Sequence, residues 1–133
     1  MLRAIIADTG PLYSAVDPSD QYHLRAQNEL DLINQGKWVT LIPYPIYLEA
    51  HKLIRFRTGF DTAFHFSKNV AAQDNLINPT NDDYQAAIQW IARFSDQKIT
   101  LFDSIVAVLA TQARCPVWTY DYHFDVMQIP IWR

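Results

Sequence analysis

The sequence predicts an α/β domain with a central, mainly parallel β-sheet flanked by α-helices, and three observations lead to that prediction. Short apolar runs alternate with longer segments of helical periodicity, which is the pattern of strand–helix–strand units. The chain has 133 residues, enough for one hydrophobic core, so we expect a single domain over residues 1–133. Half of the residues are hydrophobic and 19% are charged, a balance typical of folded chains.

Two strands and one helix are predicted in the first third of the chain. Residues 2–8 form a short apolar run that ends in an acid, which predicts a buried strand, and Thr9-Gly10-Pro11 predicts a turn after it. Apolar residues at roughly helical spacing predict a helix over residues 19–35, with Gly36 as its stop signal. Residues 38–42 predict a second strand because they are apolar and β-branched and are followed by prolines.

Two further helices and a weaker strand are predicted in the middle of the chain. Residues 46–57 form a helical stretch that Thr58-Gly59 ends, and residues 60–73 are expected to resume as another helix. Residues 75–78 are a weaker strand candidate before a proline. The expected buried residues of the first of these helices are Ile46, Leu53 and Ile54.

The last third of the chain predicts two helices and two short strands. Thr80 and Asp83 have the spacing of a capping box, which predicts the start of a helix. Residues 102–113 have hardly a polar break, and a helix that is apolar on nearly all sides belongs in the middle of a domain. Residues 116–120 and 128–132 predict strands.

Composition excludes several classes of protein. The net charge of −3 argues against a protein that coats nucleic acid, although it allows an enzyme with one local basic patch. Cys115 is the only cysteine, so an intrachain disulfide and a cysteine-based zinc site are both impossible. The chain has neither an apolar run of about 18 residues nor the pattern of a signal peptide, so a cytoplasmic protein without membrane contact is expected.

Four acids, Asp8, Glu49, Asp103 and Asp121, fall at structurally meaningful places. Asp8 and Asp121 each follow a predicted strand, where ligands bind in open α/β sheets. Asp103 opens the most buried helix, where the positive end of the helix dipole favours an ionised carboxylate. Glu49 lies in a helix near residues expected to face the core. Taken singly, each acid also has a structural explanation as a helix cap, a turn residue or an ion-pair partner of a nearby lysine.

Together the four acids predict a metal site. Four carboxylates at one end of a sheet repel one another, and the pKa of each rises unless divalent cations neutralise the cluster. Ligation by oxygen alone suits hard ions such as Mg²⁺ or Mn²⁺. The chemistry that such a site supports is hydrolysis of phosphodiester bonds by metal-activated water, without a covalent enzyme intermediate.

Four segments of the chain resemble the four motifs of PIN domains. Residues 5–12 resemble the opening motif, residues 45–49 the glutamate-bearing second motif, residues 101–107 the third and residues 119–124 the fourth. Their order and spacing agree with the family over nearly the whole chain. The resemblance implies a parallel sheet flanked by helices, binding of Mg²⁺ or Mn²⁺, and cleavage of RNA. Compact members of the family are most often VapC-type toxin ribonucleases, each neutralised by a small antitoxin, and they commonly form homodimers.

By this resemblance Asp8, Glu49 and Asp103 are the main metal ligands, and Asp121 completes the site. Many relatives carry Ser, Thr or Asn where this chain has Gly10, so supporting contacts here must come from Thr9, Thr119 or water. Asp125 is a second candidate for the fourth acid. We favour Asp121 because it directly follows the predicted strand.

Other residue groups allow both functional and structural interpretations. Lys52, Arg55 and Arg57 form the one basic cluster, which either guides RNA toward the metals or is simply a solvated helix face. The four histidines match no zinc template and are expected on the surface or in packing. Aromatic residues between positions 44 and 66 are expected to be partly core and partly a groove for an antitoxin or a second subunit: Tyr44, Tyr47, Phe56, Phe60, Phe64 and Phe66.

The sequence therefore predicts a metal-dependent endoribonuclease, with two alternatives. One is a non-catalytic PIN-like module that binds protein or RNA through its acidic pocket or aromatic groove. The other is a DNA-directed nuclease, but such enzymes carry DNA-gripping segments for which this chain has no space. A G-x-S-x-G elbow and a P-loop are both missing from the sequence, which excludes the corresponding hydrolase motifs.

Overall fold

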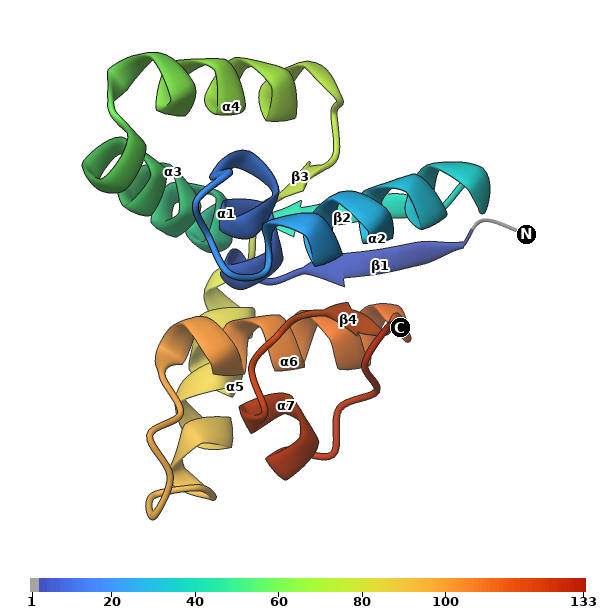
Figure 1. Cartoon of the computed structure of the whole chain (residues 1–133). Helices are drawn as coiled ribbons and strands as arrows, with labels where there is room; N and C mark the ends of the chain where they lie inside the picture. The colour runs from blue at the N-terminus through green and yellow to red at the C-terminus, as the bar shows by residue number, and fades with distance from the viewer. Residues whose placement is uncertain (1–2) are drawn as a thin grey trace.

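Four parallel strands form the central sheet of the computed structural model, which describes residues 3–133 (Figure 1). The sheet order is β3-β2-β1-β4, with Ile5 paired to Thr40 on one side and Ile6 to Val117 on the other. This architecture confirms the predicted α/β class with a parallel sheet. The strands are β1 (Ala4–Ala7), β2 (Val39–Pro43), β3 (Leu76–Ile77) and β4 (Val117–Trp118).

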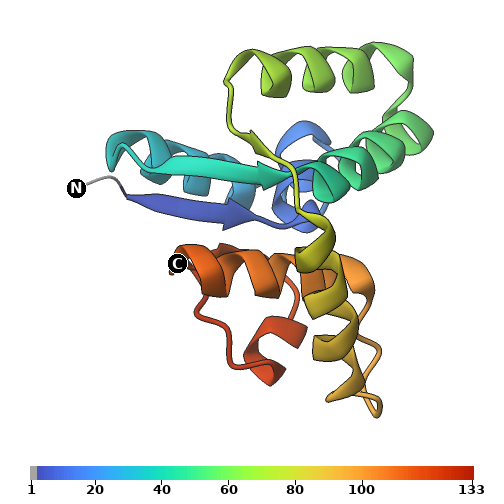
Figure 2. The same ribbon diagram turned by 180° about the vertical axis from the view of Figure 1, so that it is seen from behind.

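Helices cover both faces of the sheet. In the two opposite views, α1 and α2 lie against one face, and α6 lies against the other beside α5 (Figures 1 and 2). The helix pair α3 and α4 packs at the end of the sheet to which β2 leads. The helices are α1 (Thr9–Val16), α2 (His23–Gln35), α3 (Tyr44–Thr58), α4 (Phe60–Ala72), α5 (Asn81–Ala92), α6 (Leu101–Ala113) and α7 (His123–Val126).

The core is built around β1 and α6, as the apolar runs in the sequence predicted. Ile5, Ile6 and Ala7 are fully buried, and every residue of α6 from Asp103 to Ala110 is buried. In α3, Ile46 and Ile54 are fully buried while Leu53 is half-buried. Gly59 ends α3 with a φ of 102°, a backbone conformation that favours glycine, so the predicted break at this residue is confirmed.

The predicted turn at Thr9-Gly10-Pro11 is wrong, because α1 begins at Thr9. The first four N–H groups of a helix have no partner within the helix, so a proline in the first turn removes no hydrogen bond. Gly10 and Pro11 are therefore compatible with a helix start that directly follows the strand. The predicted first strand began at residue 2, which lies outside the described residues.

The C-terminal segment and α2 also differ from the prediction. Residues 128–132 contribute a single bridge between Ile131 and Val117 rather than a strand, and the one-turn helix α7 before them was not predicted. The helix predicted over residues 19–35 begins only at His23. Its apolar residues are spread around its circumference, so Leu24 is 77% exposed while Ile33 is buried.

The arrangement of strands and helices leads the carboxyl ends of β1, β2 and β4 to one side of the molecule. There the chain passes directly from β1 into α1 and from β2 into α3, and the start of α6 lies nearby (Figure 1). Among residues 3–133, no helix has both the length and the apolar character that crossing a membrane requires.

Candidate metal centre

All four predicted acids line one pocket, of about 480 Å³, at the carboxyl ends of β1 and β4. Asp8 follows β1, Glu49 projects from α3, Asp103 lies in the first turn of α6, and Asp121 follows β4. Four segments that are far apart in the sequence thus bring their carboxylates to the same side of the sheet. The convergence that the sequence could only imply is present in the folded chain.

Asp8 is the most deeply buried of the four acids. Its side chain is 7% exposed, and its Oδ2 accepts a hydrogen bond of 2.7 Å from Thr119 Oγ1. Burial, with a smaller contribution from the charges of Asp103 and Asp121, raises the pKa of Asp8 to about 7 against the opposing effect of the Thr119 hydrogen bond. Asp8 occupies the N-cap position of α1 but makes no capping hydrogen bond, so a capping role does not explain its position.

Asp103 is held by a capping box at the start of α6. The Thr100 backbone N–H donates to Asp103 Oδ2 at 3.0 Å, and the Asp103 N–H donates to Thr100 Oγ1 at 3.3 Å. The N-cap residue is therefore Thr100 and not Asp103, which lies three residues later. Burial raises the pKa of Asp103, and the nearby charge of Asp121 adds to this effect while the Thr100 N–H opposes it. A structural role and a place in the pocket coexist at this residue.

Asp121 lies in the pocket and Asp125 does not. The Asp121 N–H donates to Thr119 Oγ1 at 3.0 Å, and Asp121 Oδ1 accepts the His123 N–H at 2.9 Å, which fixes the carboxylate in a short turn. Asp125 is exposed and lines a separate, smaller hollow. The geometry therefore favours Asp121 as the fourth acid.

Glu49 is positioned by a hydrogen bond from Thr9, whose Oγ1 donates to Glu49 Oε1. The ion pairs with Lys52 or Lys37 that could have explained Glu49 structurally are not formed. Thr9, at the start of α1, thus contacts Glu49, and Thr119, directly after β4, contacts Asp8, as expected where Gly10 has no side chain to offer.

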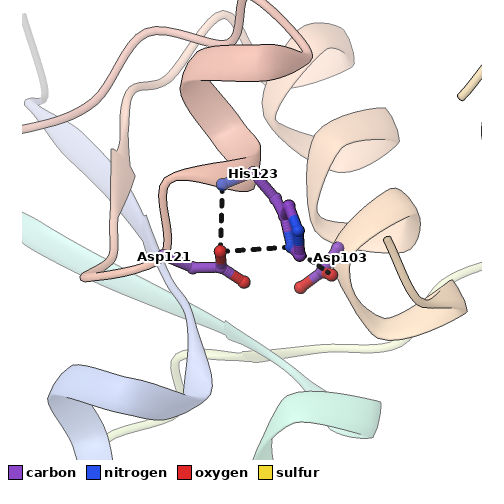
Figure 3. A group of neighbouring side chains, drawn as sticks. All are labelled: Asp103, Asp121 and His123. Atoms are coloured by element: carbon purple, nitrogen blue, oxygen red, sulfur yellow. Dashed lines mark hydrogen bonds and ion pairs between the residues drawn. The ribbon is translucent and has the colours of Figure 1, made fainter. Parts of the chain in front are cut away.

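His123 also lies in the pocket, beside Asp103 and Asp121, a position that the sequence pattern did not indicate for any of the four histidines (Figure 3). Its Nδ1 is 3.2 Å from Asp121 Oδ1 and 3.7 Å from Asp103 Oδ2. Both ring nitrogens are buried, and neither makes a hydrogen bond. The sequence signal that could have identified His123 is its position two residues after a predicted ligand.

The predicted basic residues are distributed unequally around the site. Arg57 lines the pocket, as does Lys98, which the sequence reasoning did not single out. Lys52 lines a neighbouring hollow that shares Glu49 with the pocket. Arg55 lies outside both hollows, with its guanidinium 5.8 Å from the ring centre of Phe60. Within residues 3–133, no lysine or arginine lies within ion-pair distance of any of the four acids.

The residues of the pocket fit a divalent metal ion. Asp103, Asp121 and His123 each offer a ligand atom, and these atoms lie within 4.8 Å of one another. Asp8 and Glu49 extend the set with two further carboxylates in the same pocket. Because no lysine or arginine among residues 3–133 pairs with this charge, a divalent cation would suit this donor set.

Comparisons with known proteins agree on the fold. No protein-family model matches the sequence, and no curated protein matches it significantly. Among solved structures, the Mycobacterium tuberculosis toxin VapC20, described as cleaving the sarcin–ricin loop, superimposes with a TM-score of 0.84 at 16% identity, over 97% of this chain and 98% of that one. FitAcB from Neisseria gonorrhoeae gives a TM-score of 0.73 at 14% identity, over 97% and 96% of the two chains.

A third match is VapBC2 from Rickettsia felis, solved with a DNA fragment from its promoter. Its TM-score is 0.71 at 12% identity, over 96% of this chain and 93% of that one. The chain therefore has the PIN-like fold that the four sequence motifs predicted, over essentially its whole described length.

Proposed function

We propose that this chain is a metal-dependent endoribonuclease of the VapC type and the toxin of a type II toxin–antitoxin pair. The observation that carries the proposal is the convergence of four carboxylates, from Asp8, Glu49, Asp103 and Asp121, in one pocket with no lysine or arginine paired to them. The PIN-like fold supports the same proposal.

The four acids of the pocket and two nearby threonines have definable roles in this reaction. Asp8, Glu49, Asp103 and Asp121 would hold Mg²⁺ or Mn²⁺, which when bound would supply an activated water and offset charge on the phosphate. Thr119 and Thr9 orient Asp8 and Glu49 through the hydrogen bonds described above.

The cations around the pocket provide attraction for the substrate backbone. Arg57 and Lys98 lie at the same pocket as the acids, so their charges draw an RNA phosphate toward the metal ligands without neutralising them. Lys52, in the neighbouring hollow, extends this path. Arg55 packs on Phe60 and is the weakest of the predicted RNA contacts.

The partners of the chain belong to the same proposal. VapC20 is described as a sarcin–ricin-loop-cleaving toxin, and another structural neighbour, with a TM-score of 0.59, is described as a toxin–antitoxin complex from Klebsiella pneumoniae, which supports an RNA substrate and an antitoxin here. We also propose a homodimer and a cytoplasmic location.

Of the aromatic residues that could receive a partner, Phe66 is buried and Tyr47 is half-buried. Those that remain exposed are Tyr44, Phe56, Phe60 and Phe64.

The rival proposal is a PIN-like module that binds RNA or protein without cleaving it. Burial of Asp8 to the point where its pKa reaches about 7 destabilises the ionised cluster. A module that only binds gains nothing from this arrangement, whereas a metal site does. The acids therefore favour the enzyme over the module.

Cleavage of a mixed RNA pool by the purified protein tests the proposal. With Mg²⁺ or Mn²⁺ we expect cleavage that EDTA abolishes and that Asp103→Asn lowers by about 100-fold or more, the order of loss when one group stabilising charge at a reacting centre is removed. Asp83→Asn is the matched control, because Asp83 holds the same position in a capping box outside the pocket. Cleavage that persists at full rate in Asp103→Asn contradicts the assigned site, and no cleavage by the wild type favours the binding module.

A further inference from the structure

His123 is the non-carboxylate member of the group that it forms with Asp103 and Asp121 in the acidic pocket. It begins α7, two residues after Asp121, and its ring extends between Asp121 and Asp103 (Figure 3). The side chain is only 11% exposed, and neither ring nitrogen forms a hydrogen bond. Buried polar atoms are almost always paired, so two ring nitrogens without a hydrogen bond, one of them (Nδ1) close to two carboxylates, require an explanation.

The position of the ring is that of a ligand rather than of a hydrogen-bond donor. Nδ1 lies 3.2 Å from Asp121 Oδ1, a hydrogen-bond distance, but the direction of the ring nitrogen does not satisfy hydrogen-bond geometry with that oxygen. Two adjacent donors of an octahedral ion with bonds of ~2.1 Å are ~3.0 Å apart, and each points at the ion rather than at the other donor. The observed separation and misalignment of Nδ1 and Oδ1 both fit this arrangement.

The geometry points to His123 as a nitrogen ligand of the metal that Asp103 and Asp121 hold, which makes the site prefer a transition ion such as Mn²⁺ over Mg²⁺. This inference rests on the proposed function, since it names a further ligand of the proposed metal site. Imidazole nitrogen is a good ligand for first-row transition ions, whereas Mg²⁺ binds oxygen and retains its waters. One histidine among four acids therefore shifts the choice between two ions that carboxylates alone accept similarly.

A different role for the same ring is a cation that pairs with the two aspartates. In that case a positively charged His123 would balance the charge of the aspartates in place of a metal ion, and it would not coordinate the ion when one binds. The two roles differ in a directly measurable way, because only a ligand places a nitrogen nucleus in contact with the ion.

Pulsed EPR of Mn²⁺ bound to the protein tests the inference without relying on activity. The wild type is expected to show ¹⁴N coupling to the bound Mn²⁺, and His123→Gln is expected to bind Mn²⁺ without that coupling. His65→Gln is the matched control: His65 is exposed on α4, away from the pocket, and its variant should retain the coupling. Circular dichroism of each variant verifies that it is folded, and His123→Asn is a second variant if His123→Gln unfolds.

Titration of the two metals gives an independent measurement. By calorimetry, His123→Gln is expected to bind Mn²⁺ about tenfold or more weakly than the wild type, with little change in its affinity for Mg²⁺. A loss of this size is usual when a group of a metal site is removed. An unchanged ratio of the two affinities overturns the inference, as does bound Mn²⁺ in the wild type with no ¹⁴N coupling. Mn²⁺ that binds without nitrogen leaves the proposed nuclease intact, whereas failure of the wild type to bind any Mn²⁺ contradicts the metal site itself.

Discussion

The helices α5 and α6 pack against each other and begin with the same Thr-x-x-Asp capping box. The pKa values of the two aspartates are nevertheless shifted in opposite directions. In α5 the Thr80 N–H donates to Asp83 Oδ2 at 2.8 Å, and in α6 the Thr100 N–H donates to Asp103 Oδ2 at 3.0 Å. In both boxes the aspartate N–H returns a hydrogen bond to the threonine hydroxyl. The local structure around the two carboxylates is therefore nearly the same.

What differs is the tertiary environment of each carboxylate. The Thr80 N–H, with Gln112 Nε2 donating at 2.8 Å, lowers the pKa of Asp83 below its ordinary value. Burial beside Asp121 raises the pKa of Asp103, although Thr100 makes the same hydrogen bonds. A capping motif therefore does not indicate function by itself. The burial and the neighbouring charges of the carboxylate decide whether it only stabilises the helix start or is also suited to bind a cation.

Stabilisation of the folded chain by metal is the property in which the two capping-box acids should differ most. Mn²⁺ at about 100 times its dissociation constant should stabilise the wild type by ~2.7 kcal/mol, because it binds the folded state alone. Asp83→Asn should retain this stabilisation and Asp103→Asn should lose most of it. The measurement is the free energy of unfolding in urea with Mn²⁺ and with EDTA. Equal stabilisation of both variants would show that Asp103 is no more a ligand than Asp83.

Several site residues and one of the two capping boxes could be predicted from the sequence. Asp8 and Asp121 could be proposed because each follows an apolar run that predicts a strand, and strand ends meet at one edge of a parallel sheet. The Thr80–Asp83 box could be identified from spacing alone, since its hydrogen bonds are local. Asp103 could be placed at a helix start but not three residues into it, because the exact N-cap depends on backbone geometry.

Features that depend on distant parts of the chain could not be predicted. The histidines match no zinc template in the sequence, and the closeness of His123 to Asp103 joins residues 20 positions apart that no spacing rule relates. The helix α1 was missed because Gly10 and Pro11 are turn residues by composition and become helical only where a buried strand leads directly into them. The unequal placement of Arg55 and Arg57, two residues apart on one helix, follows from which side of α3 faces the pocket.

A smaller effect is expected from removal of the threonine hydroxyl of each box. Thr80→Ala and Thr100→Ala should each lower the free energy of unfolding in EDTA by about 1 kcal/mol, the usual loss of an N-cap side chain. Only Thr100→Ala should also weaken Mn²⁺ binding, since Thr100 positions an acid of the pocket. Urea unfolding and Mn²⁺ titration measure the two effects, with Thr→Ser at each position as the control that keeps the hydroxyl. Equal losses of Mn²⁺ affinity in the two alanine variants would contradict the comparison.

The smallest effect, and the one that tests the electrostatic difference itself, is the pH dependence of stability without metal. Asp83 has a lowered pKa in the fold, so its ionised form contributes stability above the unfolded-state pKa of about 3.9, and this contribution is lost as the pH falls below that value. Asp103 has a raised pKa, so its ionised form destabilises the fold at neutral pH, and protonation relieves this as the pH falls toward about 3.9.

The free energies of unfolding of the wild type, Asp83→Asn and Asp103→Asn should therefore be compared in EDTA between pH 3 and pH 7.5. Relative to Asp83→Asn, the wild type should be more stable near neutral pH by about 0.5 kcal/mol, the size of a charge–helix interaction, and should lose that advantage in acid. Relative to Asp103→Asn, the wild type should instead gain stability as the pH falls from neutrality. Two difference curves with the same slope would mean that the two boxes hold equivalent acids, and the pocket would lose the electrostatic property that distinguishes it from an ordinary helix start.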